Sequence, residues 1–268
     1  MKLGITGSIG ILGTILRQQL DEAGISYSCF EGDIRSKSDI EKWVQDNDWD
    51  GVIHLAAIVP TKQVKEDPLM AYDVNVAGTV NLMVALEKAW RGQKKWFFYA
   101  SSSHVYKSSD KAIQETDTLE PVSLYGKMKL MAEDVVQEAG KVGTYPFDVC
   151  VGRIFSFYHK TQQPPFLYPN ILKRLKEEDL TQDFFLYGAD SIRDFLNAEE
   201  VVDIIVKLAQ KRSVGTFNIA SGKPTKIRDF VQSLSPVPLK ITTNDEKDFL
   251  LADIAKLKQE LKGEKNDK

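Results

Sequence analysis

Tyr125 and Lys129 are the two residues of this sequence whose types and spacing point most directly to chemistry. A separation of four residues places both side chains on one face of a helix, so a phenol and an ammonium group can lie side by side. A tyrosine ordinarily titrates near ~10, which is too high for a proton carrier at neutral pH. An ammonium group at about 4–5 Å, at an effective dielectric constant near 20, stabilises the phenolate by roughly 3–4 kcal/mol. The pair therefore predicts a tyrosine that acts as acid or base, with a pKa that the lysine lowers towards working pH.

A glycine-rich loop stands near the start of the chain, where residues 6–13 read TGSIGILG. It follows an apolar run and precedes a helical pattern, the context in which glycines let the backbone approach a dinucleotide pyrophosphate. Amides at the N-terminus of that helix could bind the phosphates. About 20 residues further on, Glu31 and Asp33 compete for the role of the acid that binds the adenosine ribose. Because Arg35 and Lys37 could instead accept a 2′-phosphate, we expect NAD, with NADP as the alternative.

Three serines, Ser101, Ser102 and Ser103, follow the apolar run 96–99. A run of this kind predicts a strand, so the serines are expected at a strand end beside the nicotinamide. A hydroxyl there can hydrogen-bond to a substrate carbonyl as its charge changes.

The elements that must position these residues alternate between strands and helices through the first 150 or so residues. Strand-like runs lie at residues 3–6, 27–30, 52–55, 96–99 and 147–151, with helical patterns at 12–23, 69–90 and 124–139. This alternation predicts an α/β fold with a Rossmann-type, doubly wound parallel sheet whose ligand lies at the carboxyl ends of the strands. Further helical patterns beyond residue 157 predict a smaller, mainly helical C-terminal part. We expect a dinucleotide-binding domain at 1–157 and a substrate domain at 158–268, interleaved with the first.

Composition excludes several classes of function. The formal charge of −3, from 35 basic and 38 acidic residues, provides no basic field for nucleic acid. The two cysteines, Cys29 and Cys150, suggest neither a disulfide framework nor a metal site. We expect neither a signal peptide at the start of the chain nor an apolar run that approaches the ~18 residues needed to span a membrane. We therefore predict a cytoplasmic protein without a membrane partner.

A set of ordered segments resembles the extended short-chain dehydrogenase/reductase family, in its nucleotide-sugar epimerase/dehydratase branch. The matching segments lie at residues 6–13, 32–35, 52–57, 73–82, 101–106, 121–129, 152–155, 192–195 and 217–222. The resemblance implies Tyr125 as acid or base, Lys129 as the residue that bonds the nicotinamide ribose, and Ser102 as a hydroxyl donor to the substrate. It also implies that Asn75 supports the active-site helix and that Arg193 contacts a substrate diphosphate.

The remaining binding residues follow from the same resemblance. The cofactor is expected to contact Tyr125 and Lys129 together with Gly7, Ile9, Gly10, Ile11, Gly13, Glu31, Asp33, Ile34, Leu55, Ala56, Ala57, Asn75 and Phe155. The substrate, a nucleotide sugar, is expected to contact Ser103, His104, Ser156 and Arg193. The family also pairs the helices near 69–90 and 124–140 with their copies in a second subunit, which implies a homodimer.

Departures from the family pattern reduce the number of reactions that the chain is expected to catalyse. The 4,6-dehydratases of this branch carry two acidic residues directly after the catalytic hydroxyl, where this chain has Ser103 and His104, so dehydration is disfavoured. His104 stands where epimerising keto-sugar reductases carry an acid/base cysteine. The C-terminal part is short, which favours reduction of a 4-keto-6-deoxy sugar over a 4-epimerase reaction. A dinucleotide-sensing binding protein without activity is a further alternative, against which the intact Ser102, Tyr125 and Lys129 argue.

Overall fold

A six-stranded parallel sheet with strand order β2-β1-β3-β4-β5-β9 forms the centre of the fold. In the computed structural model, which describes residues 1–141 and 147–262, its strands are β1 (Lys2–Thr6), β2 (Ser26–Cys29), β3 (Gly51–His54), β4 (Lys95–Ser102), β5 (Phe147–Ile154) and β9 (Gly215–Ile219). The chain adds β2 on one side of β1 and β3 on the other, so the strand order reverses between β1 and β3. Such a reversal opens a crevice at the carboxyl ends of the strands. The predicted Rossmann-type, doubly wound sheet is confirmed.

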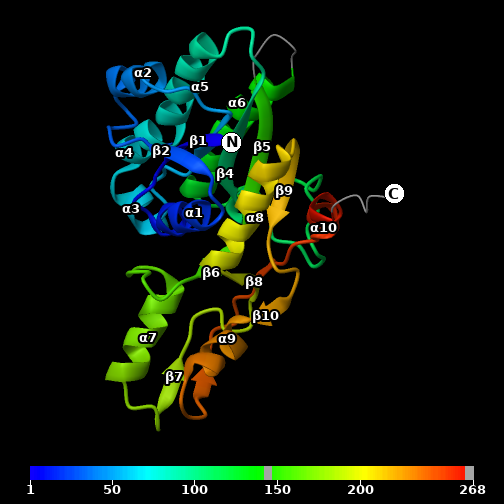
Figure 1. Ribbon diagram of the computed structural model, residues 1–268. Helices are drawn as coiled ribbons and strands as arrows, with labels where there is room; N and C mark the ends of the chain where they lie inside the picture. Colours follow the sequence, from blue (N-terminus) through cyan, green and yellow to red (C-terminus); the bar gives the residue numbers. More distant parts are fainter. Residues whose placement is uncertain (142–146, 263–268) are drawn as a thin grey trace.

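Helices cover both faces of this sheet (Figure 1). Helices α1 (Ile11–Glu22) and α8 (Ala198–Lys211) pack on one face, where Leu16 and Val201 belong to the same core. Helices α2 (Lys37–Gln45), α5 (Gly78–Ala89) and α6 (Leu124–Lys141) cover the other face, with a second core that includes Ile40, Leu82 and Val136. The two layers together bury the sheet, as a parallel sheet requires.

The predicted helix at 69–90 is built from three consecutive pieces. Following α3 (Thr61–Glu66), these are α4 (Pro68–Tyr72), the π-helical turn η1 (Asp73–Ala77) and α5. Among the described residues, Pro68–Ala89 is long and apolar enough to cross a membrane by length and composition, which corrects the expectation that no apolar run approaches that length. Half of the apolar window is buried inside the protein.

A smaller part lies beyond one end of the sheet, with α7, β7 and α9 at its far side (Figure 1). Its elements are β6 (Ser156–Tyr158), α7 (Leu167–Glu177), β7 (Asp183–Phe185), β8 (Ile192–Asn197), β10 (Pro224–Lys226), α9 (Ile227–Leu234), β11 (Lys240–Thr242) and β12 (Phe249–Leu250). Strands β10-β8-β12 form one small sheet to which β6 adds, and β11 pairs with β7. Ile171, Phe184 and Val231 belong to a separate small core.

The second half of the chain does not stay in this smaller part. Helix α8 packs on α1, β9 pairs with β5, and α10 (Ala255–Leu261) lies beside β9. Residues 158–268 were predicted to be mainly helical, but the structure has short strands between their helices. Runs of two to six residues are too short to reveal their alternation in the sequence.

Candidate active site

The glycine loop lies at the carboxyl end of β1 and leads into α1, whose N-cap is Gly10. Gly7 has φ +71°, and a Cβ there would lie 2.6 Å from the backbone nitrogen of Ala56. A Cβ at Gly13 would lie 2.2 Å from the carbonyl oxygen of Gly7, so α1 packs directly against the loop. A Cβ at Gly10 would meet only that same oxygen, at 3.4 Å, which leaves the helix N-terminus approachable. The loop therefore fits a dinucleotide pyrophosphate.

The predicted contacts around this loop differ in exposure. Ile9 is 91% exposed, and Ile11 is half-buried at the start of α1. The segment 55–57 that follows β3 is half-buried, and the amide of Ala56 donates a hydrogen bond to Thr6 Oγ1 (3.3 Å). These residues all lie at the carboxyl ends of β1 and β3, where the sheet topology opens its crevice.

Asn75 holds the loop after β3 in place. From the π-helical turn, its Nδ2 donates to the carbonyl of Ile58 (2.9 Å), and its Oδ1 accepts from the amide of Ile58 (2.7 Å). The side chain is buried, and both of its polar groups are used by one backbone. Asn75 thus supports the loop beside the glycine loop, while a direct contact with a cofactor stays a prediction.

His54 links the end of β1 to the same helix. Its Nδ1 lies 2.6 Å from Thr6 Oγ1, and its Nε2 lies 2.9 Å from Thr79 Oγ1. Because the Thr79 hydroxyl donates to the carbonyl of Asn75 (3.0 Å), it accepts the proton of Nε2, and Nδ1 accepts from Thr6. Burial, followed by the charge of Lys129, lowers the pKa of His54 to about 3. The imidazole is therefore a neutral structural link.

An ion pair occupies the predicted adenosine end of the crevice. Arg35 Nη2 lies 2.5 Å from Asp33 Oδ2, and Nε lies 2.9 Å from Oδ1. Hydrogen bonds from Arg35 hold the pKa of Asp33 below its ordinary value. Glu31, just after β2, is exposed, and Ile34 is buried against the start of α5 at Gly78. The guanidinium that the sequence offers to a 2′-phosphate is already bound by a carboxylate.

Ser102 and Tyr125 meet at the end of β4. The strand continues to Ser102 and does not end near Tyr99. Helix α6 begins after Ser123, whose hydroxyl accepts from the amide of Gly126 (3.0 Å), and so presents Tyr125 in its first turn. Burial raises the pKa of Tyr125 to about 12, and a hydrogen bond with the Ser102 side chain opposes that rise. The two predicted catalytic hydroxyls thus lie near enough for Ser102 to affect the pKa of Tyr125.

Lys129 lies on the same helix face as Tyr125, but its ammonium group binds elsewhere. Its Nζ donates to the carbonyl of Ala100 (2.7 Å) and lies 4.9 Å from the ring centre of Tyr99. Burial lowers the pKa of Lys129 to about 7, against an opposing effect of Glu133. The expectation that Lys129 brings the pKa of Tyr125 towards neutrality is wrong for this chain, because burial of the phenol raises that pKa and the opposing effect comes from Ser102. At neutral pH Tyr125 holds its proton.

The short turn η2 (Ser103–Val105) brings two of the predicted substrate residues to the site. Ser103 is buried, whereas His104 is exposed and packs on the ring of Tyr125. The surrounding protein and then the charge of Arg193 lower the pKa of His104, while Asp248 has the opposite effect. The acid–base centre and Arg193 are therefore within electrostatic reach of each other.

Arg193 lies on β8 in the smaller part and is paired with Asp248 through two contacts. The pair borders a cavity of about 340 Å³. Ser156, on β6, lies beside this strand, because it pairs with Phe195 of β8. Phe155 is buried, with its ring 6.1 Å from that of Tyr106. Arg193, one of the predicted substrate residues, thus faces this cavity.

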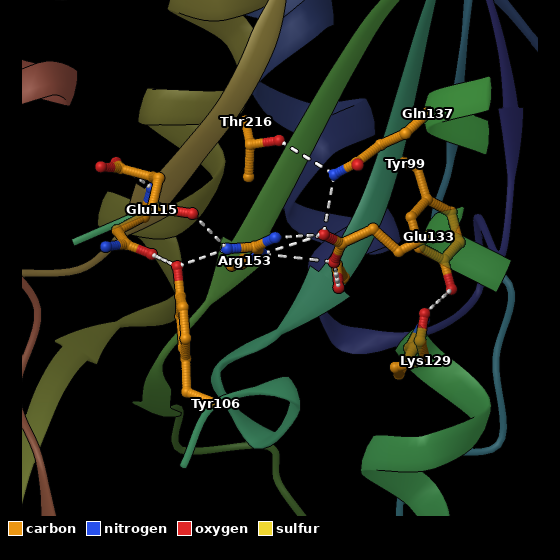
Figure 2. A network of polar contacts seen from close by, with 10 residues as sticks. Tyr99, Tyr106, Glu115, Lys129, Glu133, Gln137, Arg153 and Thr216 are labelled. Atoms are coloured by element: carbon orange, nitrogen blue, oxygen red, sulfur yellow. Dashed lines mark hydrogen bonds and ion pairs between the residues drawn. The ribbon is translucent and has the colours of Figure 1, made fainter. Parts of the chain in front are cut away.

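Glu133 and Arg153 form a buried ion pair that the sequence did not reveal (Figure 2). Glu133, one turn after Lys129, accepts hydrogen bonds from Ser101 Oγ (2.5 Å) and from Arg153 Nη2 (2.5 Å). Gln137 donates a further bond to it (2.9 Å). Glu133 and Arg153 are 0% and 3% exposed, so these hydrogen bonds are what makes the buried charges tolerable.

Arg153 extends this network to the far edge of the sheet. Its Nη1 donates to the hydroxyl of Tyr106 (2.8 Å) and to the carbonyl of Glu115 (2.9 Å). The Tyr106 hydroxyl in turn donates to Asn218 on β9 (2.6 Å). Hydrogen bonds of this network thereby join strands β4, β5 and β9 and helix α6 (Figure 2).

Comparison with known proteins gives one family model and many relatives. Residues 6–248 match the family model described as GDP-mannose 4,6 dehydratase. The GDP-6-deoxy-D-mannose reductase of Pseudomonas aeruginosa is 29% identical over 195 residues, which cover 70% of this chain and 63% of the relative. UDP-glucose 4-epimerase 2 of Oryza sativa subsp. japonica is 28% identical over 224 residues, covering 75% and 54%. The chain thus spans between about half and two thirds of the length of these curated relatives.

Solved structures show the same fold over nearly the whole chain. The protein RMD from Pseudomonas aeruginosa, complexed with NADPH, superposes with a TM-score of 0.84 at 24% identity, covering 97% of this chain and 92% of that one. A UDP-glucose 4-epimerase of Thermus thermophilus in complex with NAD gives a TM-score of 0.80 at 19% identity, with the same coverage.

Proposed function

This chain belongs to the GDP-mannose 4,6-dehydratase family, and we propose that it is an NAD(P)-dependent oxidoreductase that reduces the 4-keto group of a nucleotide-linked 6-deoxy sugar. The family assignment confirms the resemblance to the nucleotide-sugar branch of the extended short-chain dehydrogenases/reductases. The observation that carries the proposal is that three predicted catalytic side chains are buried at one place, Ser102 at the end of β4 and Tyr125 and Lys129 one turn apart on α6.

The protonation of Tyr125 favours the direction of reduction. A nicotinamide dinucleotide, when bound, supplies the hydride. Because its pKa is about 12, Tyr125 is protonated at neutral pH and can donate a proton to the oxygen of a reduced carbonyl. The Ser102 hydroxyl, buried at the end of β4 beside Tyr125, is proposed to hydrogen-bond to that oxygen as charge develops. Lys129 is proposed to contact the nicotinamide ribose.

Dehydration is not proposed, although the family model takes its name from a dehydratase. The positions after Ser102 are a buried serine and an exposed histidine, Ser103 and His104, and neither is a carboxylic acid of the kind expected in a 4,6-dehydratase. The second candidate is a 4-epimerase, because relatives such as the rice protein carry that name. An epimerase would have to take a proton from the substrate onto Tyr125 first, and a raised pKa opposes removal of the phenol's own proton.

The cofactor is proposed to be NAD, with NADP as the alternative. Glu31 is exposed at the adenosine end, and Asp33 holds Arg35, so both acids oppose a 2′-phosphate there. The relatives with bound dinucleotides include one NADPH and one NAD complex, which is compatible with either choice.

The substrate is proposed to bind between the two parts of the chain. We assign dinucleotide binding to residues 1–157 and substrate binding mainly to residues 158–268, where Arg193 would meet the diphosphate. The cavity beside Arg193 offers space for the nucleotide. Ser103, His104 and Ser156 would contact the sugar.

A homodimer is proposed through the exposed apolar residues of two neighbouring helices. On the helix Pro68–Ala89 these are Leu69, Tyr72 and Val84, and on α6 they are Leu124, Met131 and Val135. Side chains of this kind on two adjacent helices suit a four-helix interface. The exposed half of the helix at 68–89 would then meet a second copy and not a lipid. Light scattering at micromolar concentration should give the mass of a dimer, and a monomer would contradict the interface.

We further propose that the protein works in the cytoplasm and binds no nucleic acid. Both cysteines are free thiols, as in a reducing compartment, and the net charge of −3 opposes attraction to phosphate backbones.

Mass spectrometry of reaction mixtures tests the proposed activity. GDP-, UDP- and dTDP-linked 4-keto-6-deoxy sugars are incubated with NADH or NADPH, with Tyr125→Phe as the control protein. We expect one of them to gain two hydrogens with matching oxidation of the dinucleotide. Interconversion of 4-hydroxy sugars without net oxidation would replace the reductase by the epimerase. Binding of dinucleotide without any turnover would favour the sensing protein.

A further inference from the structure

Arg193, the residue proposed to bind the substrate diphosphate, already holds an anion supplied by the protein. Its Nη1 lies 2.5 Å from Asp248 Oδ1, and its Nη2 lies 2.8 Å from Asp248 Oδ2. This two-point contact is the geometry in which a guanidinium also binds phosphate. A phosphate that reaches Arg193 therefore meets a guanidinium whose two terminal nitrogens are both engaged.

The backbone around Asp248 is fixed, so the chain itself holds the carboxylate at Arg193. Strand β12, which starts one residue later, runs parallel to β8 with Leu250 opposite Arg193. The carbonyl of Asp248 accepts from the amide of Ile192 (2.9 Å), and its amide donates to Ser191 Oγ (3.1 Å). Separation of the pair therefore requires rotation of a side chain and no movement of the backbone at Asp248.

The pair is accessible from the cavity beside it. The side chains of Arg193 and Asp248 are 21% and 43% exposed, so a ligand can reach both. The cavity is lined by this pair and by Tyr187, Gly188, Ser191, Ile227, Glu246 and Lys247. It thus carries two cations and two carboxylates, and the carboxylate of Asp248 would lie against any anionic group bound at Arg193.

The pair also acts on the catalytic end of the site. Arg193 lowers the pKa of His104 and Asp248 raises it, so both charges lie close enough to affect a residue that contacts Tyr125. A ligand that bridges Arg193 and Tyr125 would therefore pass beside Asp248.

We propose that Asp248 is a specificity-determining residue, which competes with the phosphate groups of the substrate for Arg193 and so weakens the binding of nucleoside diphosphates. This proposal rests on the proposed function, because it takes the ligand of Arg193 to be a diphosphate. The carboxylate imposes a threshold: a ligand is retained only if its remaining contacts in the cavity compensate for the displacement of Asp248. The effect is expected to be moderate, since a partly exposed ion pair is weak.

Calorimetry with UDP, GDP and dTDP tests the competition in the full chain with NADH bound. Asp248→Asn keeps the size of the side chain but removes its charge, and should tighten binding of the preferred diphosphate about three- to tenfold. Uridine, guanosine and thymidine, which lack phosphate, should bind equally well to both proteins. Asp183→Asn is the matched control, because it removes a carboxylate from another ion pair of the smaller part, with Lys240, and should change nothing.

Further variants separate failure of this inference from failure of the proposed function. Arg193→Gln should weaken the diphosphate at least about tenfold. If it does so while Asp248→Asn and Asp248→Ser leave the affinity unchanged or lower, with NADH binding intact, the competition is refuted and the proposed function stands. If none of the three diphosphates binds the wild type, the proposed substrate class is refuted as well. The gain in the Asp248 variants should also shrink between about 0.05 and about 0.5 M salt, because the competition is electrostatic.

Discussion

The imidazole of His104 lies edge to face on the phenol ring of Tyr125, with ring centroids 5.6 Å apart and planes at 76°. The backbones next to these two rings also approach each other closely, because a Cβ at Gly126 would lie 2.2 Å from the carbonyl oxygen of His104. Any side chain at position 126 would push the start of α6 away from the turn that follows β4. The glycine between Tyr125 and Lys127 is thus needed to bring a substrate residue and the acid–base residue together.

Loss of the phenol hydroxyl should remove turnover and leave dinucleotide binding nearly intact. In Tyr125→Phe the proton donor is absent, and we expect kcat to fall by roughly 10²–10⁴. The Kd of the dinucleotide should stay close to that of the wild type, because the glycine loop and the adenosine end are unchanged. Tyr27→Phe, which removes from β2 a hydroxyl that donates to Asp21 of α1, serves as the control. Near-normal turnover with saturating substrate would refute the mechanism.

The choice between NAD and NADP should depend on Asp33. We expect the wild type to bind NADH more tightly than NADPH, because Glu31 and Asp33 place negative charge near the 2′ position. Asp33→Asn should raise the affinity for NADPH, since it releases Arg35 from its ion pair. Titration calorimetry measures both constants, with Asp46→Asn on the exposed end of α2 as the control. A wild-type preference for NADPH would contradict this assignment.

His54 should make the protein sensitive to acid. Because its pKa is about 3 in the folded protein and near 6.5 in the unfolded chain, the unfolded chain binds an extra proton between those values. Folding stability should therefore fall as pH drops through this window, by at most about 4–5 kcal/mol. His54→Gln should be less stable at neutral pH but lose less stability on acidification. Urea unfolding at about pH 7 and about pH 4.5 measures the difference, and parallel losses in both proteins would contradict it.

The predictable features of the site are those that depend on local periodicity. A strand that runs into three serines and a helix with Tyr125 and Lys129 on one face were both expected, and the structure contains both. The different surroundings of Ser101 and Ser102 also follow from the strand period of two, because neighbouring side chains of a strand point to opposite faces of the sheet. Ser102 affects the pKa of Tyr125, whereas Ser101 donates a hydrogen bond to Glu133.

The features that the sequence did not reveal depend on register between distant elements. Glu133 and Arg153 are 20 residues apart, and Arg193 and Asp248 are 55 apart, so no local pattern joins them. One signal for Glu133 was present: it stands four residues after Lys129 and three before the buried Val136, on the same helix face. A buried charge in such a position requires a partner. The partner is Arg153, and it can be identified only from the pairing of β4 with β5, which sets Arg153 opposite Ser101.

The role of His104 separates a simple reductase from an epimerising one. If the enzyme only reduces the carbonyl at C4, no proton leaves a sugar carbon, and reaction in heavy water should leave C3 and C5 free of deuterium. His104→Ala should then lower activity only modestly, through loss of its contact with the Tyr125 ring. If His104 acts as acid or base at carbon, both positions could exchange, and the same variant should abolish that exchange. A pure 4-epimerase would show no solvent exchange and no net consumption of NADH. The surrounding protein and then the charge of Arg193 lower the pKa of His104, which favours the neutral imidazole that a base requires and makes the test demanding. We expect the first pattern, and deuterium at C3 or C5 of the product, measured by mass spectrometry or NMR, would refute it.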